Sequence, residues 1–222
     1  MTGSLVQLNV NDQPVNAYLA LPAEGQGPGI LVLHAWWGLK PFFKELCDRL
    51  AAQGFVALAP DLYHGPVATT IDEAKALMEA ADSQQMGATV MAAKDFLLTH
   101  PAQTAAKLGV MGFSMGSGWA LMATTRAPEQ FAAVVSFYGA GEAEFGQMQA
   151  KFMGHFSDTD EWEPLKWVNW MADAMKTAGV DATILIYPGL PHWFMESDRP
   201  EYTPEAANLA WERTVTFFKE NL

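Results

Sequence analysis

The chain has 222 residues, of which 50% are hydrophobic and 17% are charged, a balance typical of one globular domain with a single core. Thirteen basic against 25 acidic residues give a formal net charge of −12, so the chain lacks the basic surface that nucleic acid or an anionic membrane would require. The single cysteine, Cys47, excludes an internal disulfide and a multi-cysteine metal site, and its helical context indicates a small packed side chain.

Strands and helices are predicted to alternate through the first half of the chain. Two short strands, 4–10 and 15–21, flank Asn11-Asp12 and suggest a hairpin. A continuous apolar run then predicts a buried strand at 29–34. Further along we expect a helix at 42–52, a strand at 55–59 and helices at 71–81 and 86–98, the last two separated by polar residues 82–85.

The second half continues the alternation. Strands are predicted at 108–112, 131–138, 150–156 and 182–187, and helices at 115–127, 163–178 and 203–222. In the last helix Thr203 can cap the N-terminus. Alternation of this kind indicates an α/β fold with a mostly parallel sheet, covered by helices on both faces. In such sheets the ligand crevice lies at the carboxyl ends of the strands, so polar residues directly after strands are the candidates for chemistry.

Ser114 is the candidate nucleophile. It lies at the centre of Gly112-Phe-Ser-Met-Gly116, between a predicted strand and a predicted helix, which is the context in which G-x-S-x-G forms a nucleophile elbow. The alternative interpretation of the same motif is a glycine-eased turn whose serine caps the helix.

A nucleophilic serine needs a base, and the base needs an acid partner that fixes its tautomer. His192 follows the predicted strand 182–187, and Asp160 follows the one that ends at residue 156. The chain order serine, aspartate, histidine is the order of α/β-hydrolases. Taken singly, His192 would be a loop histidine and Asp160 a solvated turn residue, but together with Ser114 they form a candidate triad.

Two backbone N–H groups are predicted to form an oxyanion hole. One belongs to Met115, directly after the nucleophile, and the other to Trp36, in the loop after the strand 29–34. Five residues around these positions are expected to line the substrate pocket: Ala35, Trp37, Trp193, Phe194 and Glu196. The tryptophans could equally be apolar cover over the strand end.

The chain resembles the dienelactone hydrolase family of α/β-hydrolases over nearly its whole length. The matching segments are His34-Ala-Trp-Trp-Gly-Leu, Ala59-Pro-Asp-Leu-Tyr, Gly112-Phe-Ser-Met-Gly, Gly154-His-Phe-Ser-Asp-Thr-Asp and Tyr187-Pro-Gly-Leu-Pro-His-Trp-Phe. The resemblance implies one α/β-hydrolase domain over residues 1–222, with Ser114, Asp160 and His192 in the triad. Asp158 competes for the role of the acid, but the family's acid ends the segment that closes at Asp160.

Three positions depart from the family's founding type. Ser114 replaces a cysteine, and Ala35 replaces a glutamate that acts on the thiol. These two changes agree, because histidine activates a serine hydroxyl directly. Glu196 stands where the family holds a substrate carboxylate with an arginine. Neutral esters or lactones are therefore expected to be better substrates than a dienelactone carboxylate.

The sequence thus predicts a serine carboxylic-ester hydrolase that needs no cofactor and no metal, since the histidines share no metal-ligand spacing. The expected partner is a small ester or lactone. A thioesterase or other acyl-transfer hydrolase, and a non-catalytic binding protein of the same fold, are the alternatives. With no signal peptide and no membrane-spanning apolar run, we expect a cytoplasmic monomer or small homo-oligomer that binds neither nucleic acid nor a membrane.

Overall fold

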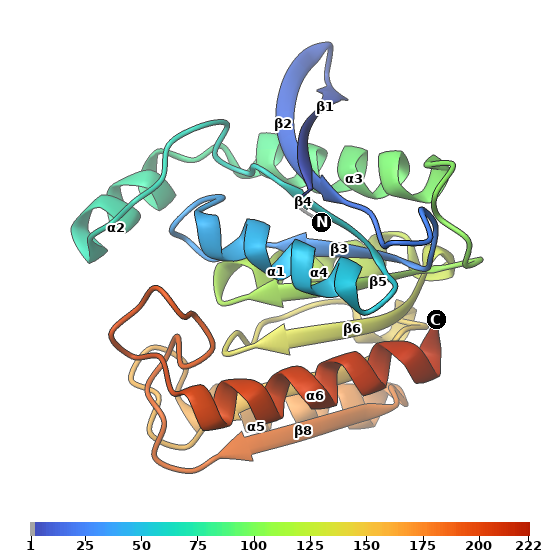
Figure 1. Ribbon diagram of the computed structural model, residues 1–222. Helices are drawn as coiled ribbons and strands as arrows, with labels where there is room; N and C mark the ends of the chain where they lie inside the picture. Colours follow the sequence, from blue (N-terminus) through green and yellow to red (C-terminus); the bar gives the residue numbers. More distant parts are fainter. Residues whose placement is uncertain (1–2) are drawn as a thin grey trace. The chain divides into compact units, whose positions relative to one another are not determined.

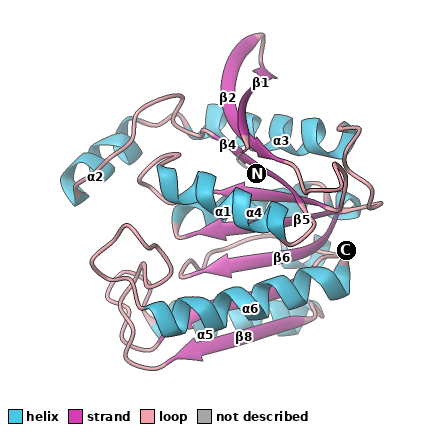
Figure 2. Ribbon diagram, in the orientation of Figure 1, coloured by secondary structure: helices cyan, strands magenta, loops and turns pink. Residues whose placement is uncertain are grey.

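The structure is a computed structural model that describes residues 3–222. Its internal contacts divide the chain into two compact units, Met1–Leu108 and Gly109–Leu222. Each unit combines strands with helices, as the alternation in the sequence predicts (Figure 2). The single domain expected over residues 1–222 stays a prediction.

The sheet of the first unit has the strand order β1-β2-β4-β3. These strands are β1 (Ser4–Val10), β2 (Gln13–Ala20), β3 (Gly29–Leu33) and β4 (Val56–Pro60). The predicted hairpin joins β1 to β2, and its turn residues Asn11 and Asp12 have φ angles of 51° and 61°, the left-handed values that a tight two-residue turn needs. β3 and β4 pair in parallel, and all their residues are buried, which explains their uninterrupted apolar sequences.

Helices α1 (Pro41–Ala52), α2 (Ile71–Ala80) and α3 (Ser83–Thr99) complete the first unit. In Figure 1, α1 lies in front of β3 and β4, whereas α3 lies behind the strands of this unit. The buried face of α1 includes Cys47, whose side chain is fully enclosed, and burial raises the pKa of its thiol. The prediction of a packed, unreactive cysteine agrees with this position.

The prediction for α3 was wrong at its start. We expected polar residues 82–85 to separate two helices, but the helix already begins at Ser83. Asp82 is its N-cap, and the Oδ1 atom of Asp82 accepts the N–H groups of Gln84 and Gln85 at 2.8 and 3.2 Å. The polar residues therefore begin a helix, because their side chains satisfy N–H groups that have no partner in the first turn.

The sheet of the second unit has the strand order β5-β6-β7-β8, and β6, β7 and β8 pair in parallel. The strands are β5 (Leu108–Phe113), β6 (Phe131–Phe137), β7 (Lys151–Ser157) and β8 (Ala182–Tyr187), and the helices are α4 (Met115–Arg126), α5 (Leu165–Ala178) and α6 (Pro204–Asn221). In Figure 1, α6 lies in front of these strands and α5 behind them. Residues that directly follow β6, β7 and β8 consequently emerge at one edge of this sheet.

The start of α5 differs from the prediction, and the cap of α6 differs in its hydrogen bond. α5 begins at Leu165 and not at residue 163, because the Glu163 N–H is bound to Asp160 and Pro164 occupies the N-cap position. Thr203 is the N-cap residue of α6, but its side-chain oxygen makes no cap hydrogen bond and instead donates to the Glu201 carbonyl oxygen at 3.3 Å. Two short 3-10 helices, η1 (Pro128–Gln130) and η2 (Phe145–Gln147), were not predicted.

Candidate active site

Ser114 occupies the single residue between β5 and α4, with φ 49° and ψ −113°. This conformation is costly for any residue with a side chain, and the neighbouring glycines make it possible. A Cβ atom on Gly112 would lie 2.3 Å from the Gly116 carbonyl oxygen, and one on Gly139 would lie 2.5 Å from that of Ser114. The Ser114 N–H donates to the Phe137 carbonyl oxygen at 2.9 Å, which fixes the turn to β6.

The imidazole of His192 lies between a hydroxyl and a carboxylate. Its Nδ1 atom is 2.6 Å from Asp160 Oδ2, and its Nε2 atom is 3.1 Å from Ser114 Oγ. A carboxylate can only accept, so Nδ1 carries the hydrogen and Nε2 is free to accept the hydroxyl proton of Ser114. The three residues follow β5, β7 and β8, and the structure brings them together as the sequence predicts.

Asp160 is held in place by its own loop. Its side chain is 1% exposed, and its Oδ1 atom accepts the N–H groups of Trp162 and Glu163, both at 2.8 Å. This leaves Oδ2 directed at His192. The competing Asp158 is exposed, and its Oδ1 atom accepts the Gly189 N–H at 2.7 Å. The geometry therefore pairs His192 with Asp160.

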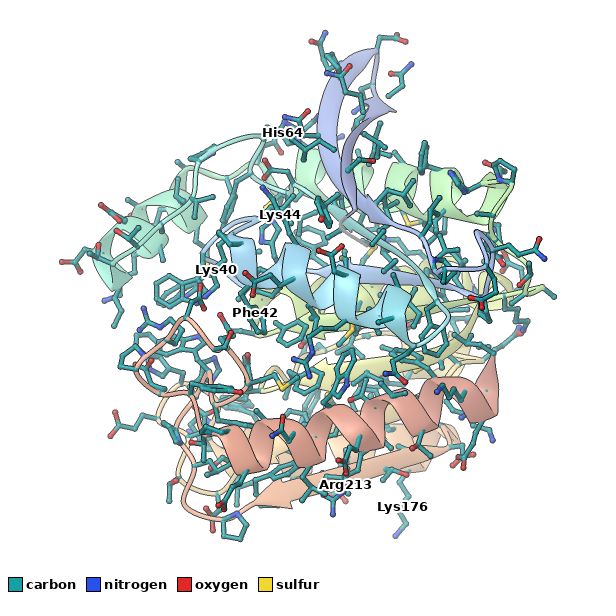
Figure 3. All side chains as sticks on the ribbon, in the orientation of Figure 1. Lys40, Phe42, Lys44, His64, Lys176 and Arg213 are labelled. Carbon is teal, nitrogen blue, oxygen red and sulfur yellow. The ribbon has the colours of Figure 1, made fainter. Side chains whose placement is uncertain are left out.

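The expected oxyanion donors lie on different units. Met115 is the first residue of α4, so its N–H belongs to the positive end of a helix. Trp36 and Trp37 belong to the first unit, where their rings contact edge to face at 5.4 Å. The Lys40 ammonium lies 5.6 Å from the centre of the Trp37 ring, at the start of α1 (Figure 3). Contributions of Trp36 to an oxyanion hole, and of Ala35 and Trp37 to a pocket, stay predictions.

Trp193 and Phe194 pack around the histidine from its own loop. The Trp193 ring meets the His192 ring edge to face at 4.9 Å, and Phe194 is fully buried against Tyr187. A groove of about 370 Å³ opens beside His192 and Trp193, with the half-exposed Trp162 on its wall. Arg213 of α6, labelled in Figure 3, donates to the Tyr187 hydroxyl oxygen at 3.2 Å.

Tyr138 is a site residue that the sequence reasoning missed. It directly follows β6, has a φ of 39°, and lies with its ring centre 4.7 Å from that of His192. Its hydroxyl donates to Glu196 Oε1 at 2.8 Å. The predicted strand 131–138 included Tyr138, whereas the observed strand ends at Phe137, so the sequence did not mark Tyr138 as a residue that follows a strand.

Glu196 is completely buried. Burial, followed by the negative charge of Glu196, raises the pKa of Tyr138 well above its usual range, so this phenol stays a hydrogen-bond donor at neutral pH. We expected Glu196 to line the substrate pocket, opposite a substrate carboxylate. Its carboxylate instead has a partner within the protein, so any effect on a bound anion would act through its charge.

Tyr138→Phe should destabilise the protein by about 1–3 kcal/mol, because the buried Glu196 carboxylate loses its hydroxyl donor. The matched control is Tyr18→Phe. The Tyr18 hydroxyl also contacts a carboxylate, that of Asp48 at 3.1 Å, but Asp48 is partly exposed and water can replace the hydroxyl there. Urea unfolding of both variants measures the difference, and an equal loss in the two would contradict the assigned importance of the buried pair.

Within residues 3–222, no group of three or more His, Cys, Asp or Glu side chains is arranged to hold a metal ion. Both ring nitrogens of His34, for example, have backbone partners: Nδ1 is 2.7 Å from the Ala35 carbonyl oxygen, and Nε2 accepts the Leu62 N–H at 3.0 Å. Over the same residues, no helix has the length and apolar character needed to cross a membrane.

Comparison with known proteins gives consistent matches. The sequence model of the dienelactone hydrolase family matches residues 15–222. "Protein usf" of Aquifex pyrophilus is 35% identical, and the alignment covers 99% of each chain. A protein of Aquifex aeolicus named "Putative carboxymethylenebutenolidase" is 34% identical, with the same coverage. The crystal structure titled "Putative Dienelactone Hydrolase" from Klebsiella pneumoniae superimposes with a TM-score of 0.88 at 24% identity over 98% of both chains. The expected α/β-hydrolase fold is thereby confirmed.

Proposed function

Because this chain belongs to the dienelactone hydrolase family, we propose that it cleaves carboxylic esters or lactones through an acyl intermediate on Ser114. The family relationship makes the chain a hydrolase of the ester and lactone class. The observation that carries the finer proposal is the continuous chain of contacts from Asp160 through His192 to Ser114, at 2.6 and 3.1 Å. A strained serine at the N-terminus of α4 adds to it.

In the first half of the reaction, His192 Nε2 takes the hydroxyl proton while Ser114 Oγ attacks the carbonyl carbon. Asp160 keeps the imidazole in the productive tautomer and stabilises its charged form. The negative oxygen of the tetrahedral intermediate is held by the Met115 N–H, with Trp36 as the proposed second donor. A donor of this kind contributes about 3 kcal/mol in comparable enzymes.

In the second half, His192 returns the proton to the leaving alcohol oxygen, and the acyl group remains on Ser114. Water then gives a proton to His192 and attacks the acyl carbon; the bond from that carbon to Ser114 Oγ breaks, and His192 passes the proton to Oγ as the acid leaves. For a lactone, the alcohol and the acid are parts of one product. Every proton is carried by residues of this chain, so the proposed reaction consumes only the ester and water.

The substrate panel that tests this function contains esters, lactones, thioesters and amides of the same acyl group. We expect esters and lactones to give the highest kcat/KM values. Thioesters as the best substrates would favour the thioesterase alternative. No turnover of any member of the panel by the folded protein would favour a binding protein.

The oligomeric state, a monomer or a small homo-oligomer, stays a prediction. The cytoplasmic location stays a prediction as well.

Neutral esters should be better substrates than anionic lactones, because the chain carries a formal net charge of −12 and has Glu196 at the position where the family resemblance implies a carboxylate-binding arginine. We expect kcat/KM for p-nitrophenyl acetate to exceed that for a dienelactone carboxylate by at least about tenfold. The methyl ester of the same dienelactone is the matched neutral control, and added salt should narrow its advantage over the carboxylate. A carboxylate that reacts faster than its methyl ester would refute the role given to charge.

A further inference from the structure

A second carboxylate, that of Glu163, lies in the same loop as Asp160. The Glu163 N–H donates to Asp160 Oδ1 at 2.8 Å, so the backbone of Glu163 helps to orient the residue that contacts His192. Its side chain reaches a different segment, where Glu163 Oε2 accepts the Ala140 N–H at 2.9 Å. One residue thus connects the loop after β7 with the segment that follows β6.

The segment that Glu163 binds is itself part of the nucleophile's support. Gly139, directly before Ala140, packs so closely on the Ser114 carbonyl oxygen that a Cβ atom would not fit. Tyr138, directly before that, packs its ring on His192. A connection from Ala140 to Glu163 therefore ties the acid loop to the residues that position both the serine and the histidine.

The carboxylate of Glu163 also interacts electrostatically with His192. Burial raises the pKa of this carboxyl group, opposed by the Ala140 N–H; the negative charge of Asp160 raises it further, and His192 lowers it. His192 therefore favours the ionised form of Glu163. A negative charge also favours a positive charge close to it, so ionised Glu163 stabilises the charged imidazolium of His192.

Within the second unit, several other ionisable groups lie near His192, and Glu161 and Glu201 line the groove beside it. Asp160 binds its Nδ1, and Ser114 contacts its Nε2. Tyr138 packs on the ring, but its raised pKa keeps it uncharged, and Glu196 is bound to the hydroxyl end of Tyr138. Glu163 differs from Glu161 and Glu201 because it is hydrogen-bonded to Asp160 and to Ala140.

We propose that Glu163 is a positioning residue for the acid and base of this site: it anchors the Asp160 loop to Ala140, and its charge stabilises protonated His192. This role rests on the proposed function, in which His192 gains a proton when Ser114 attacks. It adds a second carboxylate to the predicted triad, three residues after the first.

Glu163→Gln separates the two parts of the role. A glutamine oxygen can still accept the Ala140 N–H, but the charge is gone. Loss of the charge disfavours protonated His192, so the acid limb of the kcat/KM profile should move to lower pH. Glu163→Ala should give the same shift and a larger loss of kcat, because the anchor is also lost.

Glu142→Gln is the matched control, since Glu142 is an exposed carboxylate two residues after Ala140, in the segment that Glu163 binds. Its acid limb should stay in place, because solvent and salt screen an exposed charge. An acid limb of Glu163→Gln that coincides with the wild-type limb would overturn the proposal, whatever happens to the rate. An equal shift of the acid limb in Glu142→Gln would overturn it as well.

A second measurement keeps this test independent of turnover. In the Ser114→Ala protein, the titration of the His192 ring can be followed by NMR with and without Glu163→Gln. A shift of its midpoint to lower pH supports the role of Glu163 even if the proposed ester hydrolysis fails. An unchanged midpoint, in a protein whose wild-type form hydrolyses esters, overturns the role of Glu163 and leaves the hydrolase proposal intact.

Discussion

Ser114→Ala should abolish the hydrolysis of p-nitrophenyl acetate while the protein stays folded. Removal of the nucleophile from such a triad lowers kcat by roughly 10⁶. The hydroxyl of Ser114 has His192 as its contact, so its loss leaves the buried core unchanged. Steady-state assays measure the loss of activity, and circular dichroism measures whether the variant stays folded. Retention of more than a few per cent of the activity in a preparation free of contaminating esterases would contradict the assignment.

Two further variants separate loss of the Ser114 hydroxyl from changes in the structure around it. Ser114→Gly should be as inactive as Ser114→Ala but more stable, because glycine adopts φ 49° and ψ −113° without the strain that any Cβ atom causes. Ser117→Ala changes a neighbouring serine of α4, whose hydroxyl donates to the Gly112 carbonyl oxygen at 3.0 Å. It should lose stability and keep most of its kcat, which distinguishes loss of the nucleophile from local damage to the elbow.

Asp160→Asn should lower kcat by a factor approaching 10⁴. Two N–H groups, from Trp162 and Glu163, bind Oδ1 of this residue. The asparagine oxygen will keep that position, so its NH₂ group must face His192 Nδ1. The imidazole then has to place its hydrogen on Nε2, where it can no longer accept the proton of Ser114. The backbone of the acid loop therefore enforces the wrong tautomer, and kcat should fall much more than KM changes.

Asp158→Asn is the control for this effect. Asp158 accepts the Gly189 N–H through Oδ1, and an asparagine oxygen can accept it equally well. Loss of activity should therefore be slight. The reverse ranking of the two variants would show that Asp158 is the acid, and equally mild losses would place the acid elsewhere in the chain.

Local sequence patterns predicted the elements of the fold well, because each pattern reflects a local physical requirement. Fully apolar runs marked β3 and β4, which are buried on both faces, and Asn11-Asp12 marked a turn that needs positive φ angles. The errors lie at helix starts. Whether Asp82 begins a helix or Thr203 caps one depends on which N–H groups their side chains reach, and that is decided by the neighbouring residues in space.

The candidate triad could be located from sequence because Ser114, Asp160 and His192 each follow a strand in a recognisable order. The contacts of Tyr138 and Glu163 could not be predicted from the sequence. Their partners lie 58 and 23 residues away along the chain, and neither residue type signals a role without its partner. The position of Glu196 was found by resemblance, but its burial against a tyrosine follows only from the packing of the loop that carries it.

The central claim, that Ser114 is an activated nucleophile, is tested most directly by labelling the protein with a fluorophosphonate and locating the label by peptide mass spectrometry. We expect a single stoichiometric label on Ser114, no label in Ser114→Ala, and a slow reaction in Asp160→Asn, in which the histidine cannot accept the serine proton. A folded, ester-hydrolysing protein that carries the label on another residue, or that takes none, would contradict the account.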